Sequence, residues 1–84
     1  MIEQIIEQYP EEEFLIADGF DDAILGIDEH EMRLIYSVSK CLKILEEQSM
    51  NELDVLEYFT FNVSGAYVGK KTPIWCWDNF FDIE

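Results

Sequence analysis

Two apolar runs of strand length, separated by three polar residues, constrain the fold of this 84-residue chain more than any other feature. The runs are AILGID (residues 23–28) and MRLIYS (residues 32–37), with Glu29-His30-Glu31 between them. Apolar runs of this length joined by a short polar loop are typical of an antiparallel β-hairpin. The loop lacks the Asn-Gly or Asp-Gly pair that fixes a two-residue turn, so the sequence leaves the register of the hairpin open.

Helical patterns lie on both sides of the hairpin. Residues 1–9 carry isoleucines and a tyrosine at helical spacing, and Pro10 ends that helix because the residue before a proline disfavours helix. Residues 37–48 predict a second helix that Ser37 or Ser39 caps. Its apolar face is expected to consist of Cys41, Leu42, Ile44 and Leu45.

A third, longer helix is predicted to begin at Ser49 and to end near residue 68. Ser49 and Glu52 have the spacing of a capping box. Gly69 is expected to end the helix in a left-handed conformation, which places the two following lysines at the negative end of the helix dipole. Gly65 is expected to allow close packing against a neighbouring element. The wide apolar face predicts burial on two sides; it consists of Leu53, Leu56, Thr60, Val63 and Tyr67, widened by Val55, Phe59 and Ala66.

The end of the chain predicts a strand and an aromatic tail. Residues 74–77 form the strand, on which Trp75 and Trp77 share one face. A turn at Asp78-Asn79 then leads to Phe80 and Phe81. Two interpretations of the tail stay open: it folds back and seals the core, or it exposes an aromatic and acidic edge that docks a partner or a second copy.

Together these elements predict an α+β fold. We expect a small three- to four-stranded, mainly antiparallel sheet with helices packed on one face, in a single domain that spans residues 1–84. No apolar run reaches the roughly 18–20 residues of a membrane helix. The first residues lack the basic and apolar regions of a signal peptide, so we expect a cytoplasmic protein.

Charge is the strongest global signal. The formal net charge is −14, and residues 1–32 contain eleven carboxylates and no lysine or arginine. Such a chain repels nucleic acid and anionic membranes, which bind through basic groups, and it attracts basic surfaces. Two interpretations stay open: the acids keep a small protein soluble, or they attract a protein that normally holds DNA or RNA.

No residue pattern predicts an enzyme. His30, the single histidine, lies in the hairpin loop, where we expect a solvated side chain and not a catalytic base. Cys41 and Cys76 are expected to be buried free thiols, because two cysteines and one histidine are too few for an ordinary zinc site. The GAYVGKKT run lies at the end of a predicted helix, whereas the glycines of a phosphate-binding loop precede one.

The acidic turn around Gly19 is the only candidate for a cation site. Asp18, Asp21 and Asp22 could hold Ca²⁺ or Mg²⁺, yet the run lacks the spacing of a calcium-binding EF-hand loop. We therefore predict turn formation with exposed charge, no bound metal and no cofactor.

Three blocks of the sequence resemble a known family. "DGFDDAILG", "IYSVSKCLKIL" and "EYFTFNVSGAYVGKKTPIW" are similar, in this order, to a pattern in small uncharacterised proteins encoded by bacteriophages and prophage-bearing bacteria. The resemblance covers about residues 18 to 77, and it implies a phage origin and a shared α+β fold. It implies no catalytic residues. The chain departs from the family at Ser37, where an acid is frequent, and in the tail after Trp77.

The sequence thus predicts a small acidic, non-enzymatic accessory protein that binds and inhibits a host protein with a basic surface, as a mimic of nucleic acid directed at a nuclease or defence complex. The alternative is a non-inhibitory phage module that forms a homodimer through its aromatic C-terminal face. Direct binding of nucleic acid or membrane is not expected. The partner-binding residues predicted are Glu7, Glu11, Glu12, Glu13, Asp18, Asp21, Asp22, Asp28, Glu29, Glu31, Trp77, Phe80 and Phe81.

Overall fold

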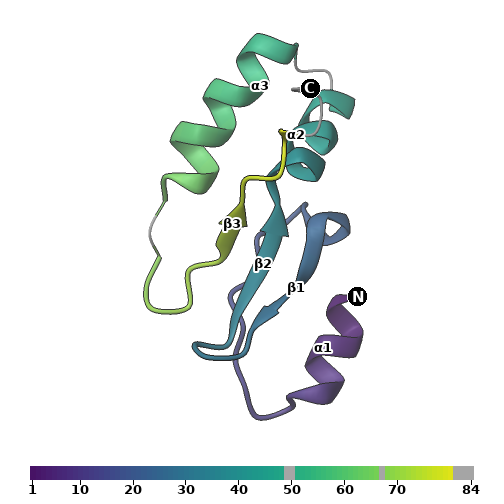
Figure 1. The fold of residues 1–84 in the computed structure, drawn as a ribbon, viewed down its shortest axis with the longest axis vertical. Coiled ribbons are helices and arrows are strands. Elements are labelled where there is room, and N and C mark those ends of the chain that lie inside the picture. Colours follow the sequence, from purple (N-terminus) through teal and green to yellow (C-terminus); the bar gives the residue numbers. More distant parts are fainter. Residues whose placement is uncertain (49–50, 67, 81–84) are drawn as a thin grey trace.

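The predicted hairpin lies at the centre of the computed structural model, which describes residues 1–48, 51–66 and 68–80 (Figure 1). Strand β1 (Ile24–Asp28) pairs with strand β2 (Arg33–Ser37) in the antiparallel sense, so the hairpin is confirmed. The register that the sequence left open pairs Asp28 with Arg33 and Ile24 with Tyr36. The pairing shifts by a residue between Ile24 and Gly26, which is a β-bulge on β1.

A third strand completes the sheet. Strand β3 (Ile74–Cys76) lies beside β2, so the order is β1-β2-β3, but it runs parallel to β2. The α+β class is confirmed, with three strands in a mixed sheet instead of a mainly antiparallel one. The physical reason is the connection: two helices separate β2 from β3, and a long crossover of this kind brings the chain back in the parallel direction.

The first two helices form where the sequence predicts them. Helix α1 (Ile2–Gln8) ends before Pro10, and helix α2 (Val38–Glu47) directly follows β2. Ser37 is the N-cap of α2, and its hydroxyl accepts a hydrogen bond from the Lys40 backbone N–H at 3.2 Å. In the acidic turn Gly19 has a φ of 91°, which favours glycine, and a short 3₁₀ helix, η1 (Asp21–Ala23), follows it.

The third helix is shorter than predicted. Helix α3 (Glu52–Phe59) has Asn51 as its N-cap and continues as a π-helical segment, η2 (Thr60–Ser64). The predicted cap, Ser49, lies outside the described residues. A Cβ at Gly65 would lie 2.7 Å from the Thr60 carbonyl oxygen, so the close approach expected there is to its own helical segment.

The prediction that Gly69 ends this helix is wrong, because the helical segment ends at Ser64. Residues of low helix propensity, including β-branched Thr60 and Val63, follow Phe59 and favour the early end. Gly69 has a φ of 116° in a separate turn, which the Thr72 N–H closes by donating to the Gly69 carbonyl at 3.1 Å. The two lysines therefore lie in a turn and not at a helix terminus.

The hydrophobic core lies on one face of the sheet. Leu34 and Tyr36 alternate on β2 and are fully buried there, and the helices add their buried side chains to the same cluster. From α3 the buried residues are Val55 and Phe59, whereas Leu56 is 46% exposed. The predicted main face of α3 is therefore wrong at Leu56 and Thr60, which are exposed, and burial on two sides is wrong for the described side chains. The residues predicted to widen that face are confirmed as buried at Val55 and Phe59. The side chain of Leu53 and residue Tyr67 lie outside the described part of the chain.

Aromatic contacts join α3 to the sheet. The ring of Trp75 lies 5.1 Å from Tyr36 and 5.4 Å from Phe59, centroid to centroid. Trp77 also contacts Phe59, at 5.9 Å, which confirms that the two indoles share one face. The Tyr36 hydroxyl accepts a hydrogen bond from the Ala17 N–H at 2.8 Å, which holds the segment before the acidic turn against the core. In the described part of the chain, no helix has the length and apolar character needed to span a bilayer.

Candidate interaction surface

Most of the predicted acidic residues are exposed. Of the ten carboxylates predicted to bind a partner, seven are solvent-exposed and form no ion pair among the described residues. They come from α1, from the loop that follows it, from the acidic turn and from the hairpin loop: Glu7, Glu11, Glu13, Asp18, Asp21, Asp22 and Glu29. These side chains are free to meet a partner.

The other three acids have internal partners. Glu12 forms an ion pair with Lys71 at 3.0 Å, and Glu31 forms one with Arg33 at 2.9 Å. The Asp28 carboxylate accepts a hydrogen bond from the His30 backbone N–H at 3.1 Å, which shapes the hairpin loop. These three carboxylates stabilise the fold, so they contribute less to an intermolecular surface.

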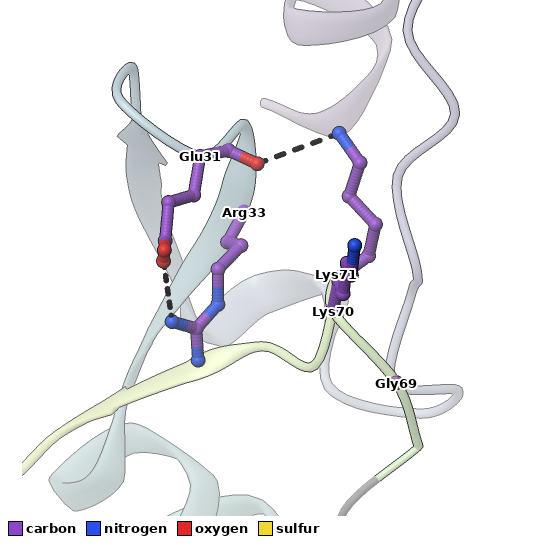
Figure 2. Close-up of a pocket in the computed structure, with 5 residues that line it drawn as sticks. All are labelled: Glu31, Arg33, Gly69, Lys70 and Lys71. Carbon is purple, nitrogen blue, oxygen red and sulfur yellow. Dashed lines mark hydrogen bonds and ion pairs between the residues drawn. The ribbon is translucent and has the colours of Figure 1, made fainter.

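A basic pocket of about 520 Å³ contains three of the five cations of the chain (Figure 2). Glu31, Arg33, Gly69, Lys70 and Lys71 line it. Figure 2 shows that the Glu31 carboxylate bonds the Arg33 guanidinium, while the Glu31 backbone carbonyl accepts from Lys71. An anion would therefore compete with acceptors that the protein itself supplies.

The bonds of this pocket connect three distant segments. Arg33 Nε donates to the Thr72 carbonyl at 2.6 Å, and Lys71 Nζ donates to the Met32 carbonyl at 3.2 Å and to Glu12. The hairpin loop, the turn before β3 and the loop after α1 are thus held together. We name Arg33, Lys71, Glu12 and Glu31 the ionic clasp; its geometry is that of a structural contact and not of an anion site.

The exposed acids do not lie on one element. Asp22 lines a shallow depression together with Lys40, Lys43 and Glu47 of α2. The hairpin loop and the loop after α1 lie at the opposite end of the molecule from α2 (Figure 1). The carboxylates therefore extend along the molecule, and those of the loop after α1 and of the hairpin loop lie farthest from the lysines of α2.

A carboxylate that the sequence did not single out caps α2. Asp78 Oδ2 accepts from the Ser37 hydroxyl at 2.6 Å, and Asp78 Oδ1 accepts from the Ser39 N–H at 2.9 Å. Desolvation by burial raises the pKa of Asp78, but the hydrogen bonds from Ser37 and Ser39 lower it by more, so the pKa lies below its usual value. The turn predicted at Asp78-Asn79 is not present. Asp78 makes this long-range contact instead, and its negative charge lies at the positive end of helix α2.

The buried thiol of Cys41 is a poor nucleophile. Burial, with a contribution from Asp78, raises the pKa of the Cys41 thiol to about 12, so the thiolate is scarce at neutral pH. Cys76 is free but only half-buried, so its predicted burial is wrong, whereas His30 is exposed in the hairpin loop as expected. In residues 1–48, 51–66 and 68–80, no group of three or more His, Cys, Asp or Glu side chains has the arrangement of a metal site.

An apolar groove of about 450 Å³ lies between the segment before the acidic turn and the outer side of α3 and η2. Leu15, Ile16 and Tyr58, which line it, are 39%, 43% and 42% exposed. Sequence reasoning missed this groove because it placed the apolar side chains of the helix in the core. Trp75 also lines the groove, and its indole N–H is buried without an acceptor among the described residues.

The tail presents aromatic side chains to solvent. Trp77 is 42% exposed and Phe80 is 60% exposed, so Phe80 does not seal the core. Phe81 lies outside the described residues. The described tail thus contacts the fold through Trp77 and Asp78 and exposes Phe80, and docking of a partner or a second copy on it stays a prediction.

Comparison with family models, with curated proteins and with solved structures found no match for this chain. The resemblance to phage-encoded proteins stays a prediction, and the assignment of the surface rests on the residues of this chain.

Proposed function

We propose that the protein binds a basic surface on a host protein and inhibits that protein. The observation that carries the proposal is that seven of the ten acids predicted to bind a partner are exposed and form no ion pair among the described residues, on a chain with a net charge of −14. A negative field of this size accelerates encounter with basic surfaces and repels nucleic acid. The resemblance to phage proteins adds the expectation that the partner belongs to a bacterial host.

The specific form of the proposal is mimicry of nucleic acid. The exposed carboxylates would take the place of phosphates in the basic groove of a nuclease, a defence complex or a regulator. Because such binding is electrostatic, its affinity falls steeply as salt screens the charges. The bound host protein would then be unable to hold its DNA or RNA, which is the inhibitory step.

The test is capture of host proteins on the immobilised chain at low salt, followed by elution with salt. We expect basic, nucleic-acid-binding proteins to elute and to be displaced by added DNA. Glu11→Lys with Glu13→Lys should abolish capture, because both side chains are exposed and unpaired among the described residues. The control reverses the exposed Glu46 and Glu47 of α2 and changes the net charge equally. Capture that survives high salt, or that both double variants reduce equally, contradicts a localised acidic surface.

A second candidate function is self-association through the aromatic face. The exposure of Trp77 and Phe80 favours it, because large exposed aromatic side chains are typical of interfaces. It predicts a dimer that salt does not dissociate, because its contacts are apolar and salt screens the repulsion between the two acidic chains. Trp77→Ser with Phe80→Ser should dissociate this dimer. Sedimentation at two salt concentrations separates it from the first function: a monomer under both conditions excludes it.

A further inference from the structure

The apolar groove beside α3 has walls that nothing in the described structure covers. Ile16 on one side and Tyr58 on the other are each more than two-fifths exposed, and Val63, which also lines the groove, is half-buried. A concave apolar site of this size buries side chains of a partner more effectively than scattered apolar residues do.

The groove continues along α3. A shallower depression lined by Phe61, Asp54 and Glu57 shares Tyr58 and Asn62 with it. Residues 54–63 run from α3 into the π-helical η2, whose rise per residue is smaller than the roughly 1.5 Å of an α-helix, so they span at most about 14 Å along the axis. A partner segment of two to three helical turns has the matching length.

The charges around this site select the occupant. Asp18 lines the groove, Asp54 and Glu57 line the depression, and none of the described lysines or arginines lines either. A second copy of the chain would bring another 14 negative charges to this rim, which disfavours it. A segment with basic side chains along its edges and apolar side chains at its centre complements both the rim and the floor.

We propose that this groove binds a basic amphipathic helical segment of the partner protein. The apolar face of the segment contacts Ile16 and Tyr58, and its basic side chains face Asp18, Asp54 and Glu57. The inference rests on the proposed function, since it assigns the place where a basic partner docks. The inference adds that binding also requires apolar contact, whereas purely electrostatic mimicry of nucleic acid does not require it.

The test uses a synthetic peptide of about 14 lysines and leucines in amphipathic helical order, and a scrambled peptide of the same composition. Each is titrated into the full chain at low salt and followed by tryptophan fluorescence, because Trp75 lines the groove. We expect the amphipathic peptide to bind about tenfold more tightly, since one buried aliphatic side chain is worth about that factor in affinity.

The matched variants are Ile16→Ser in the groove and Leu25→Ser on β1, because both side chains are 43% exposed and Leu25 does not line the groove. Ile16→Ser should weaken the amphipathic peptide about tenfold, and Leu25→Ser should leave its affinity unchanged. If Ile16→Ser does not fold, as circular dichroism would show, Tyr58→Ser takes its place.

Three results would overturn the inference. Equal, salt-sensitive binding of both peptides would agree with binding to the acidic surface and would refute the groove as the docking site. Failure of both peptides to bind at low salt would contradict the proposed function as well. A self-association of the free chain that Ile16→Ser abolishes would make a second copy the occupant.

Discussion

The carboxylate of Asp78 gives the sharpest test of the structural reasoning, because it joins the end of the chain to the start of α2. Replacement by alanine removes two hydrogen bonds, from the Ser37 hydroxyl at 2.6 Å and from the Ser39 N–H at 2.9 Å. Hydrogen bonds to ionised groups contribute about 1.5–3 kcal/mol each, and exchange of a helix cap costs about 0.5–2 kcal/mol. Because Asp78 is half-buried and water screens its charge, we expect a loss of about 2 kcal/mol.

The expected loss lowers the midpoint of thermal unfolding by about 8–16 °C, because about 1 kcal/mol shifts a domain of this size by 4–8 °C. Asp78→Asn keeps one acceptor and loses the charge, so its effect should be about half as large. Glu13→Gln is the matched control, since Glu13 is exposed and its removal changes only the general repulsion. Urea unfolding gives the free energies. A loss below about 0.5 kcal/mol for Asp78→Ala, or a loss equal to that of Glu13→Gln, would refute the contact.

The pH dependence follows from the lowered pKa of Asp78. A carboxylate with a pKa depressed by folding stabilises the protein above its unfolded pKa, near 3.9, and this stabilisation is lost as pH falls through the folded pKa. The difference between wild type and Asp78→Asn should therefore be constant from pH 7 to about 5 and should narrow below about pH 4. The difference is the quantity to measure, because protonation of the other carboxylates relieves repulsion in both proteins.

The remaining predictions concern the core, the helix and the thiols. Phe59→Ala should lower the free energy of unfolding in urea by about 3–5 kcal/mol, because Phe59 is fully buried. Leu56→Ala should lower it by about 1 kcal/mol or less, since Leu56 is 46% exposed. Equal losses would show that the buried face of α3 is assigned wrongly. Gly65→Ala should lower the melting temperature, because its Cβ would lie 2.7 Å from a backbone oxygen of η2; an unchanged temperature would contradict that approach. Cys41 should resist alkylation at pH 8 while the protein is folded, because its pKa is raised to about 12. Cys76 should react faster in a time course followed by mass spectrometry. Faster labelling of Cys41 than of Cys76 would contradict the burial of Cys41.

The sequence predicted the elements that depend on local chemistry. The hairpin, the end of α1 before Pro10 and the capping of α2 by Ser37 all follow from patterns within a few residues. The direction of β3 depends on how two helices cross the sheet, and the contact between Asp78 and Ser37 joins residues 41 positions apart. Neither leaves a local pattern, so neither could be predicted.

The face of α3 shows a second limit. Apolar residues surround this helix on most sides, so periodicity alone allows several faces. The packing of Phe59 against Trp75 selects the face that also buries Val55, and this selection leaves Tyr58 on the wall of the groove. The charge of the candidate surface could be predicted from composition, but the clasp that neutralises Glu12 pairs it with Lys71, 59 positions away.

Folding and binding respond to salt in opposite directions, and this separates the two roles of the acidic residues. The first 32 residues contain no cation, and among the described residues their only ion pairs are those with Arg33 and Lys71 in the ionic clasp, so most of their repulsion is left for ions from solution to screen. Salt screens the repulsion of a chain with 14 excess negative charges more than it weakens two exposed ion pairs, which are worth at most about 1 kcal/mol each. The free protein should therefore become more stable as salt rises, while a basic partner dissociates. Loss of binding in high salt then results from weaker contacts at the interface and not from unfolding, because the free chain is more stable under the same conditions.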